Sequence, residues 1–287
     1  MNSSIGSIRD GLAAPAGAWD LRRASRRRRS LARFAAPLAF ALLALAACDD
    51  GGSEGPALNP VDDDTIEVLA QYPVNGDALV GTVDPAHRAV WERFNELFPA
   101  ELHPEINLFV AIDAEKSGGT DGAMQLSAVN PADYYLALDV TGSVAPDELD
   151  RTMIHEFAHL LTLRPSQVPR NEAAIATCDV FTDSEGCPRE GSYLRAYFEE
   201  FWPGFLGADL AAEDKETAPA ARFATGDFVT EYAATIPTED IAEVFAEWVK
   251  AETSPAGDTV KERKLRFFDA YPELAPIRDG AREALAN

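Results

Sequence analysis

Hydrophobic residues along this 287-residue chain recur at two spacings, which separate the expected strands from the expected helices. Residues 84–98 carry apolar side chains three and four positions apart, which predicts an amphipathic helix. The short apolar run at 106–113 is typical of a buried strand, and the alternation at 133–140 predicts a half-buried strand. Residues 117–125 are rich in glycine and polar residues, and we interpret them as a loop.

Helical spacing dominates the sequence that follows. Pro146 and the acidic residues after it predict the start of a helix, because proline suits the first helical position and acids interact favourably with the helix dipole. That helix includes residues 150–163, DRTMIHEFAHLLTL. Strands that come first and helices that come afterwards predict an α+β domain over residues 63–287. Three more helices are expected, at 192–202, at 238–252 and around 260–271.

The first 62 residues show neither pattern. A basic stretch runs into an apolar one, FAAPLAFALLALAA, that is shorter than the roughly 20 residues needed to cross a bilayer as a helix. This order is typical of a secretory signal peptide, which we expect over residues 1–47. Residues 48–62 are acidic and rich in glycine and proline, and we interpret them as a flexible tether.

The residues Leu45, Ala46, Ala47 and Cys48 resemble the lipobox of bacterial lipoproteins. The resemblance implies a mature protein that starts at a lipid-modified Cys48. Such a protein would be extracytoplasmic and anchored to a bacterial membrane, facing the periplasm or the cell surface. The alternative is an ordinary signal peptide whose cleavage site falls near a cysteine.

The charge of the chain limits its partners. The formal net charge is −23, and without residues 1–47 the chain keeps 17 basic and 46 acidic residues, for a charge near −29. Such a surface repels nucleic acid and anionic lipid, so we expect no nucleic-acid partner. The charge by itself identifies no substrate.

Two cysteines remain beyond Cys48, in the segment CDVFTDSEGC. In an oxidising compartment, Cys178 and Cys187 would most simply form a disulfide across a short polar loop. The alternative is a pair of metal thiolates, which the absence of the CxxC spacing of zinc sites disfavours.

His155 and His159 lie four residues apart on the expected helix, so their side chains project from one face about one turn apart. Two imidazole nitrogens at this spacing can bind one Zn²⁺ ion, and Glu156 beside them can act as general base. Zinc polarises a bound water and a peptide carbonyl, while a carboxylate takes the proton of the water. The alternative is a pair of structural histidines on an amphipathic helix, whose core face other residues could supply.

The HEFAH motif resembles that of the zincin metallopeptidases. Two histidines do not complete a zinc site, so a third ligand is required. The third histidine of the metzincins is missing, because HEFAH is followed by LLTLRPSQV. The resemblance therefore implies a glutamate ligand, as in the gluzincins, and we interpret His87 and His103 as ordinary polar residues.

Glu239 is the preferred third ligand. Thr238 is expected to cap a helix that places Glu239 and Glu243 on one face. Glu239 would bind the metal, and Glu243 would orient a ligand imidazole through its second N–H. Tyr232 precedes Glu239 by seven residues, and its phenol could stabilise an oxyanion, protonate a leaving group or be merely structural.

Other interpretations of these acidic residues stay open. Glu172 lies in a segment similar to the thermolysin third-ligand helix, although Ala176 stands where that pattern has an acid. Glu199 or Glu200 is a further alternative. The face that carries the two glutamates of residues 238–252 lies opposite an apolar stripe, and such a face is often only solvated.

The arrangement Tyr-x6-Glu-x2-Ala-Glu at residues 232–243 resembles the C-terminal half of the lethal-factor type gluzincin site. It is also similar to a group of zinc-binding metallopeptidases found among bacterial surface lipoproteins. In that group a glutamate of the second helix is taken as ligand and the tyrosine as catalytic. About 80 residues separate the second histidine from Glu239 here, which is a long insertion.

These features lead us to expect a zincin-like fold, in which a small mixed sheet precedes the HExxH helix and a C-terminal helical part. The expected function is zinc-dependent hydrolysis of a peptide or protein substrate that pairs in extended form with an edge strand at 134–140. One alternative is a non-catalytic, zinc-containing surface lipoprotein that serves as a binding or structural module. A second alternative is a solute-binding lipoprotein in which HEFAH is incidental.

Overall fold

The computed structural model describes residues 66–127, 130, 132–169, 178–180, 186–203 and 218–287. The chain separates into two units, Met1–Gly52 and Ser53–Asn287, and all the described residues belong to the second. The expected signal peptide, tether and lipidated Cys48 therefore lie outside the described residues. Within the described ranges, no helix combines the length and the apolar character that a membrane crossing requires.

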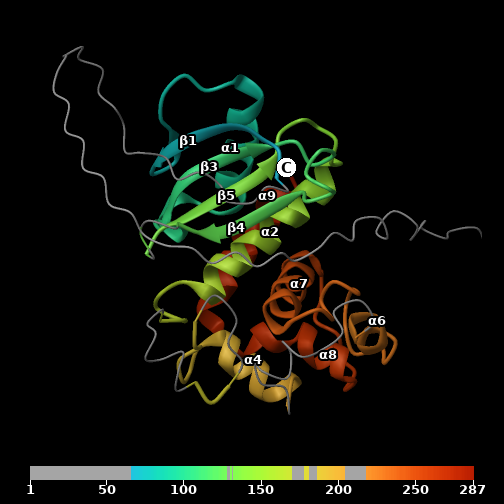
Figure 1. Ribbon diagram of the computed structural model, residues 1–287. Helices are drawn as coiled ribbons and strands as arrows, with labels where there is room; N and C mark the ends of the chain where they lie inside the picture. The colour runs from blue at the N-terminus through green and yellow to red at the C-terminus, as the bar shows by residue number, and fades with distance from the viewer. Residues whose placement is uncertain (1–65, 128–129, 131, 170–177, 181–185, 204–217) are drawn as a thin grey trace, which may run out of the picture. The chain divides into compact units, whose positions relative to one another are not determined.

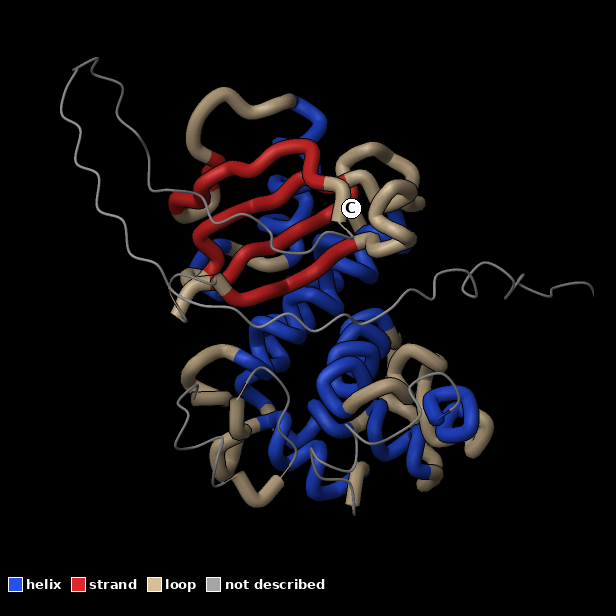
Figure 2. The backbone as a smooth tube through the Cα atoms, in the orientation of Figure 1, coloured by secondary structure: helices blue, strands red, loops and turns tan. Residues whose placement is uncertain are grey.

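Five strands of the second unit form one mixed sheet in the order β2-β1-β3-β5-β4 (Figure 2). β3 and β5 run parallel, and the other neighbouring pairs are antiparallel. The strands predicted at 106–113 and 133–140 are confirmed as β3 and β5. The strand bounds are Val68–Asn75 for β1, Ala78–Leu79 for β2, Ile106–Ile112 for β3, Gly122–Leu126 for β4 and Tyr134–Asp139 for β5.

Helix α2 connects the sheet with the helices that follow it in the chain (Figure 1). One side of α2 contacts β4 and β5, and another side contacts α7. The α+β class, with a small mixed sheet before the HExxH helix and a helical part after it, is confirmed. The helix bounds are Pro85–Leu97 for α1, Pro146–Leu163 for α2, Tyr193–Phe201 for α4, Ala218–Phe223 for α6, Pro237–Lys250 for α7, Val260–Leu265 for α8 and Ala275–Leu285 for α9, with short 3₁₀ helices at Ala100–Leu102, Phe267–Ala270 and Pro272–Leu274.

The start of α2 follows from its sequence. Pro146 occupies the first turn together with Asp147 and Glu148, whose charges suit the positive end of the helix dipole. Further along, the side chains of Met153, Phe157 and Leu160 are fully buried. Phe157 stacks on Phe98, at the end of α1, with ring centroids 3.8 Å apart. This packing anchors the motif-bearing helix against the rest of the core.

Three predictions about the strands are wrong. Residues 122–126 form strand β4 rather than a loop, because they pair with β5 along its whole length. As a result β4, and not residues 134–140, lies at the edge of the sheet. β5 is also not half-buried, because all six of its residues are buried. Tyr135 and Ala137 pack in a second apolar cluster, beside residues of β3.

The helix predictions need smaller corrections. Helix α7 begins at Pro237 after Ile236, and Thr238 makes no capping hydrogen bond. The prediction that Thr238 caps this helix is therefore wrong, since proline at the first helical position places the N-cap two residues earlier, at Ile236. Helices α6 and α9 and strand β1 were not expected from the sequence pattern.

A disulfide joins Cys178 to Cys187, as predicted. Since the bridge closes a loop with a sequence separation of 9 residues, replacing both cysteines by alanine should lower the free energy of unfolding by about 2–3 kcal/mol. Urea denaturation of the parent and the double variant would measure this difference. The parent under reducing conditions should match the variant, whereas equal midpoints under oxidising conditions would contradict the prediction.

Candidate metal centre

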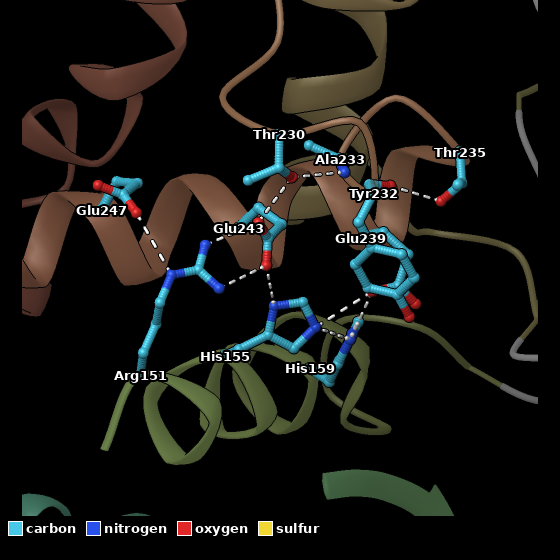
Figure 3. A network of polar contacts seen from close by, with 10 residues as sticks. All are labelled: Arg151, His155, His159, Thr230, Tyr232, Ala233, Thr235, Glu239, Glu243 and Glu247. Carbon is cyan, nitrogen blue, oxygen red and sulfur yellow. Dashed lines mark hydrogen bonds and ion pairs between the residues drawn. The ribbon is translucent and has the colours of Figure 1, made fainter. Parts of the chain in front are cut away.

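Helix α2 presents its two motif histidines on the face that meets α7 (Figure 3). The side chains of His155 and His159 are almost completely buried, and their rings lie at 77° to each other with centroids 4.7 Å apart. Their Nε2 atoms are 3.0 Å apart. The spacing of four residues therefore does bring the two ring nitrogens to one point.

Helix α7 adds the carboxylate of Glu239 to this pair. Oε2 of Glu239 lies 3.1 Å from Nε2 of His155 and 3.3 Å from Nε2 of His159. The side chain of Glu239 is only 16% exposed, so the interpretation of this helix face as merely solvated is wrong. The small residues Ala242 and Ala246 are fully buried in α7, which allows α2 to approach closely.

The three atoms have a separation that suits a metal ion. In tetrahedral zinc sites the bonds to nitrogen and oxygen are about 2.0–2.2 Å long, which places neighbouring ligand atoms about 3.3–3.5 Å apart. The observed separations of 3.0–3.3 Å are close to this range. In the described part of the chain, His155, His159 and Glu239 form a three-residue group with no fourth His, Cys, Asp or Glu. The group can therefore hold a metal and leave a position for another molecule.

Glu243 lies one helical turn after Glu239 and contacts the other nitrogen of the first histidine. Its Oε1 is 2.9 Å from Nδ1 of His155, and the Glu243 side chain is only 4% exposed. If Nδ1 carries the proton, Nε2 presents its lone pair to the group formed with Glu239. A carboxylate that fixes the orientation of a ligand imidazole is a common feature of metal sites.

Glu156 and Tyr232 both line two neighbouring pockets beside this group. The pocket of about 580 Å³ is bounded by β4, His159 and Glu239, and that of about 330 Å³ by residues 119–122, His155 and Glu243. Glu156 is buried, and its burial raises the pKa of its carboxyl group. Such a group is suited to accept a proton near neutral pH.

Gly122 explains how β4 comes so close to α2. A Cβ atom at Gly122 would lie only 2.6 Å from Cγ2 of Thr152 on the helix. A larger residue at this position would push the edge strand away from α2, and with it one wall of both pockets. The glycine is a sequence signal that could have indicated close packing here.

Tyr232 belongs to the turns before α7 and is about half exposed, at 54%. Its ring centroid lies 6.0 Å from that of His155, and Figure 3 shows its phenol beside Glu239. Partial burial of the phenol and the negative charge of Glu239 raise the pKa of Tyr232. The phenol therefore keeps its proton and can act as a hydrogen-bond donor beside the group of His155, His159 and Glu239.

The charges of the metal-free group favour a protonated histidine. Burial alone would lower the pKa of His155, but hydrogen bonds to Glu239 and Glu243 raise this pKa to about 10. Burial likewise opposes ionisation of the two acids. Contacts with the two histidines nevertheless hold the pKa of Glu239 well below its ordinary value. Contacts with His155 and Arg151 lower the pKa of Glu243 to about 2.

A zinc ion held by this group would therefore displace a proton from His155. Because His155 stays protonated up to a pH of about 10 in the metal-free protein, the apparent zinc affinity should rise about tenfold for each pH unit between roughly 7 and 9. About one proton should be released per ion. Titration calorimetry in buffers of different ionisation enthalpy would measure the release, and an affinity independent of pH in this window would contradict the assignment.

The other candidate residues lie elsewhere. Glu172 is outside the described residues. Glu199 pairs with Arg195 on the surface of α4, and Glu200 lies 3.9 Å from Arg263, so neither belongs to the three-residue group. The remaining histidines are also separate from it: Nδ1 of His87 contacts the hydroxyl of Tyr72, and His103 is buried beside the rings of Trp91 and Phe94.

Several residues that support the site were not expected from the sequence pattern. Arg151, one turn before His155, forms a two-pronged ion pair with Glu243, and Thr230 donates a hydrogen bond to the same carboxylate. Asp240, next to Glu239, pairs with Lys264 at 2.7 Å, and both side chains are fully buried. The arginine at i−4 from a motif histidine was the available signal for the first contact.

No protein-family model matches this sequence, and no curated protein matches it. Among solved structures, one match is a "putative zinc-binding metallo-peptidase" from Bacteroides caccae, with 18% sequence identity. The match covers 68% of this chain and 70% of that chain, with a TM-score of 0.33. This likeness is too low to support an inference, so the interpretation of the site rests on its own geometry.

Proposed function

We propose that this protein is an extracytoplasmic zinc-dependent peptidase of gluzincin type, tethered to a bacterial membrane through a lipid on Cys48. The observation that carries the proposal is the convergence of His155, His159 and Glu239, whose ligand atoms lie 3.0–3.3 Å apart. A purely structural zinc site would have four protein ligands. The three-residue group with a buried glutamate beside it supports catalysis instead.

The proposed mechanism gives a role to five side chains. His155, His159 and Glu239 hold the zinc ion, which when bound polarises a water molecule and the scissile carbonyl. Glu156 accepts the proton of the attacking water and passes it to the leaving amine. The phenol of Tyr232 donates a hydrogen bond to the substrate oxygen on which negative charge develops.

The substrate is proposed to be an extended peptide that pairs with β4. This edge strand lines both pockets beside Glu156, and its outer side faces no other strand of the described sheet. Main-chain hydrogen bonds to an exposed strand edge bind peptides with little regard to sequence. β4 therefore takes the role of substrate-binding edge strand that the sequence analysis assigned to residues 134–140.

The proposal is tested by measuring the zinc content and the peptide-hydrolysis activity of one preparation of the purified protein. The purified protein should contain about one zinc ion per chain and cleave an unstructured protein such as casein. A chelator should abolish the cleavage, and added zinc should restore it. Zinc retention without hydrolysis would support the alternative of a non-catalytic zinc module, and absence of stoichiometric zinc would exclude both.

A further inference from the structure

Glu243 contacts more of the site than the single imidazole that the sequence analysis assigned to it. Its buried carboxylate lies between three parts of the chain, namely α2, α7 and the turn that carries Tyr232 (Figure 3). Oε1 accepts from Nη1 of Arg151 at 3.1 Å and lies 2.9 Å from Nδ1 of His155. Oε2 accepts from Nη2 of Arg151 at 2.7 Å and from the hydroxyl of Thr230 at 2.7 Å.

These four contacts use the hydrogen-bonding capacity of the carboxylate almost completely, because two carboxylate oxygens offer about four lone-pair sites. The guanidinium of Arg151 engages both oxygens and so fixes the plane of the group. In that plane one oxygen faces His155 and the other faces Thr230.

The hydroxyl of Thr230 has a second partner. It accepts a hydrogen bond of 2.9 Å from the backbone N–H of Ala233. Tyr232 lies between these two residues in the chain, so the hydroxyl of Thr230 closes the turn that carries the phenol. The same hydroxyl joins this turn to the carboxylate that orients His155.

We propose that Thr230 is a positioning residue that links the placement of Tyr232 to the orientation of His155 through the carboxylate of Glu243. Arg151 holds the same carboxylate from the other side. Thr230 itself touches neither the proposed ligand atoms nor the proposed substrate pockets. Its contribution to catalysis rests on the proposed peptidase function, whereas its contribution to the turn does not. The two can therefore be measured separately.

The first measurement needs no activity. In Thr230→Val, which keeps the shape but removes the hydroxyl, the amide of Ala233 should exchange its hydrogen about five- to tenfold faster in the metal-free protein, because one hydrogen bond of about 1 kcal/mol is lost. Thr230→Ser should restore the parent rate. Glu243→Ala should also accelerate exchange at Ala233, since the hydroxyl loses its other partner.

Thr235→Val serves as the matched control in the same turn. The hydroxyl of Thr235 donates to the carbonyl of Tyr232 at 2.7 Å, but the backbone N–H of Thr235 donates to the same carbonyl at 3.0 Å. Its removal should therefore leave both the exchange rate at Ala233 and the hydrolysis rate unchanged. The proposal would be overturned if the exchange rate of the Ala233 amide were the same in Thr230→Val as in the parent. It would also be overturned if this rate did not change in Glu243→Ala.

The second measurement uses hydrolysis. Thr230→Val should lower kcat about tenfold with KM and zinc affinity nearly unchanged, and Thr230→Ser should recover most of the loss. In a background of Tyr232→Phe, the same substitution should have little further effect, because the phenol that it positions is already absent. Additive losses in the double variant would show that Thr230 acts by another route. If the parent protein hydrolysed no peptide, the proposed peptidase function would be refuted. The exchange measurement would still test whether Thr230 positions the turn that carries Tyr232.

Discussion

Replacing Glu156 by glutamine is expected to lower kcat/KM for peptide hydrolysis by about 10³-fold, while the protein keeps its zinc. Glutamine has nearly the same shape as glutamate but cannot accept the proton of the attacking water. Glu156 does not belong to the group of His155, His159 and Glu239, so the metal should stay bound. Cleavage of a fluorogenic peptide, together with metal content measured by atomic emission, would test both halves of the expectation.

The matched control is Glu148→Gln, which makes the same chemical change at an exposed position in the first turn of the same helix. This variant should cleave the peptide at the parent rate. If Glu156→Gln also cleaved at the parent rate, Glu156 could not be the general base, and the proposed mechanism would be wrong. Loss of zinc from Glu156→Gln would instead make Glu156 part of the metal site.

Replacing Glu239 by alanine should weaken zinc binding on the order of 10³-fold, because three ligands share a binding free energy of roughly 12 kcal/mol. The substitution removes the α7 atom that lies 3.1 and 3.3 Å from the two histidine nitrogens. Hydrolysis should fall with the metal content and recover partly at high zinc concentration. Competition with a chromophoric chelator would give the two dissociation constants.

Glu172→Ala is the matched control for the ligand assignment. It removes the competing glutamate that the sequence analysis left open and should leave zinc affinity unchanged. The reverse pattern, with zinc lost from Glu172→Ala and kept by Glu239→Ala, would move the third ligand to Glu172. Circular dichroism of both variants would show whether a change in metal binding reflects an altered fold.

The parts of the site that could be read from the sequence are those with local spacing. His155, Glu156 and His159 belong to one helix, and the repeat of 3.6 residues places the two histidines on one face. The same repeat on α7 places Glu239 and Glu243 one turn apart. Helix geometry is set by neighbours in the chain, so these relations do not depend on the rest of the fold.

The parts that could not be read from the sequence depend on contacts between distant segments. The glycine and polar residues of segment 117–125 predict a loop, yet residues 122–126 form strand β4 because they pair with β5. The contact of Arg151 with Glu243 joins residues 92 positions apart. The place of Arg151 one turn before His155 is visible in the sequence, but it does not identify Glu243 as the partner. Thr238 illustrates the remaining error, since a proline one residue earlier decides where α7 begins.

By itself, the sequence determined the α+β class, the strands at β3 and β5, the disulfide and the residues that carry the candidate chemistry. Spacing along one element and residue type decide these features, and both are visible in a linear chain. Only the tertiary structure decided that α7 packs against α2, so that Glu239 comes within 3.3 Å of both imidazole nitrogens and Glu243 is buried between Arg151 and Thr230. The reason is that packing of apolar faces sets the approach of two helices, and that approach selects which of many acidic side chains meet the histidines.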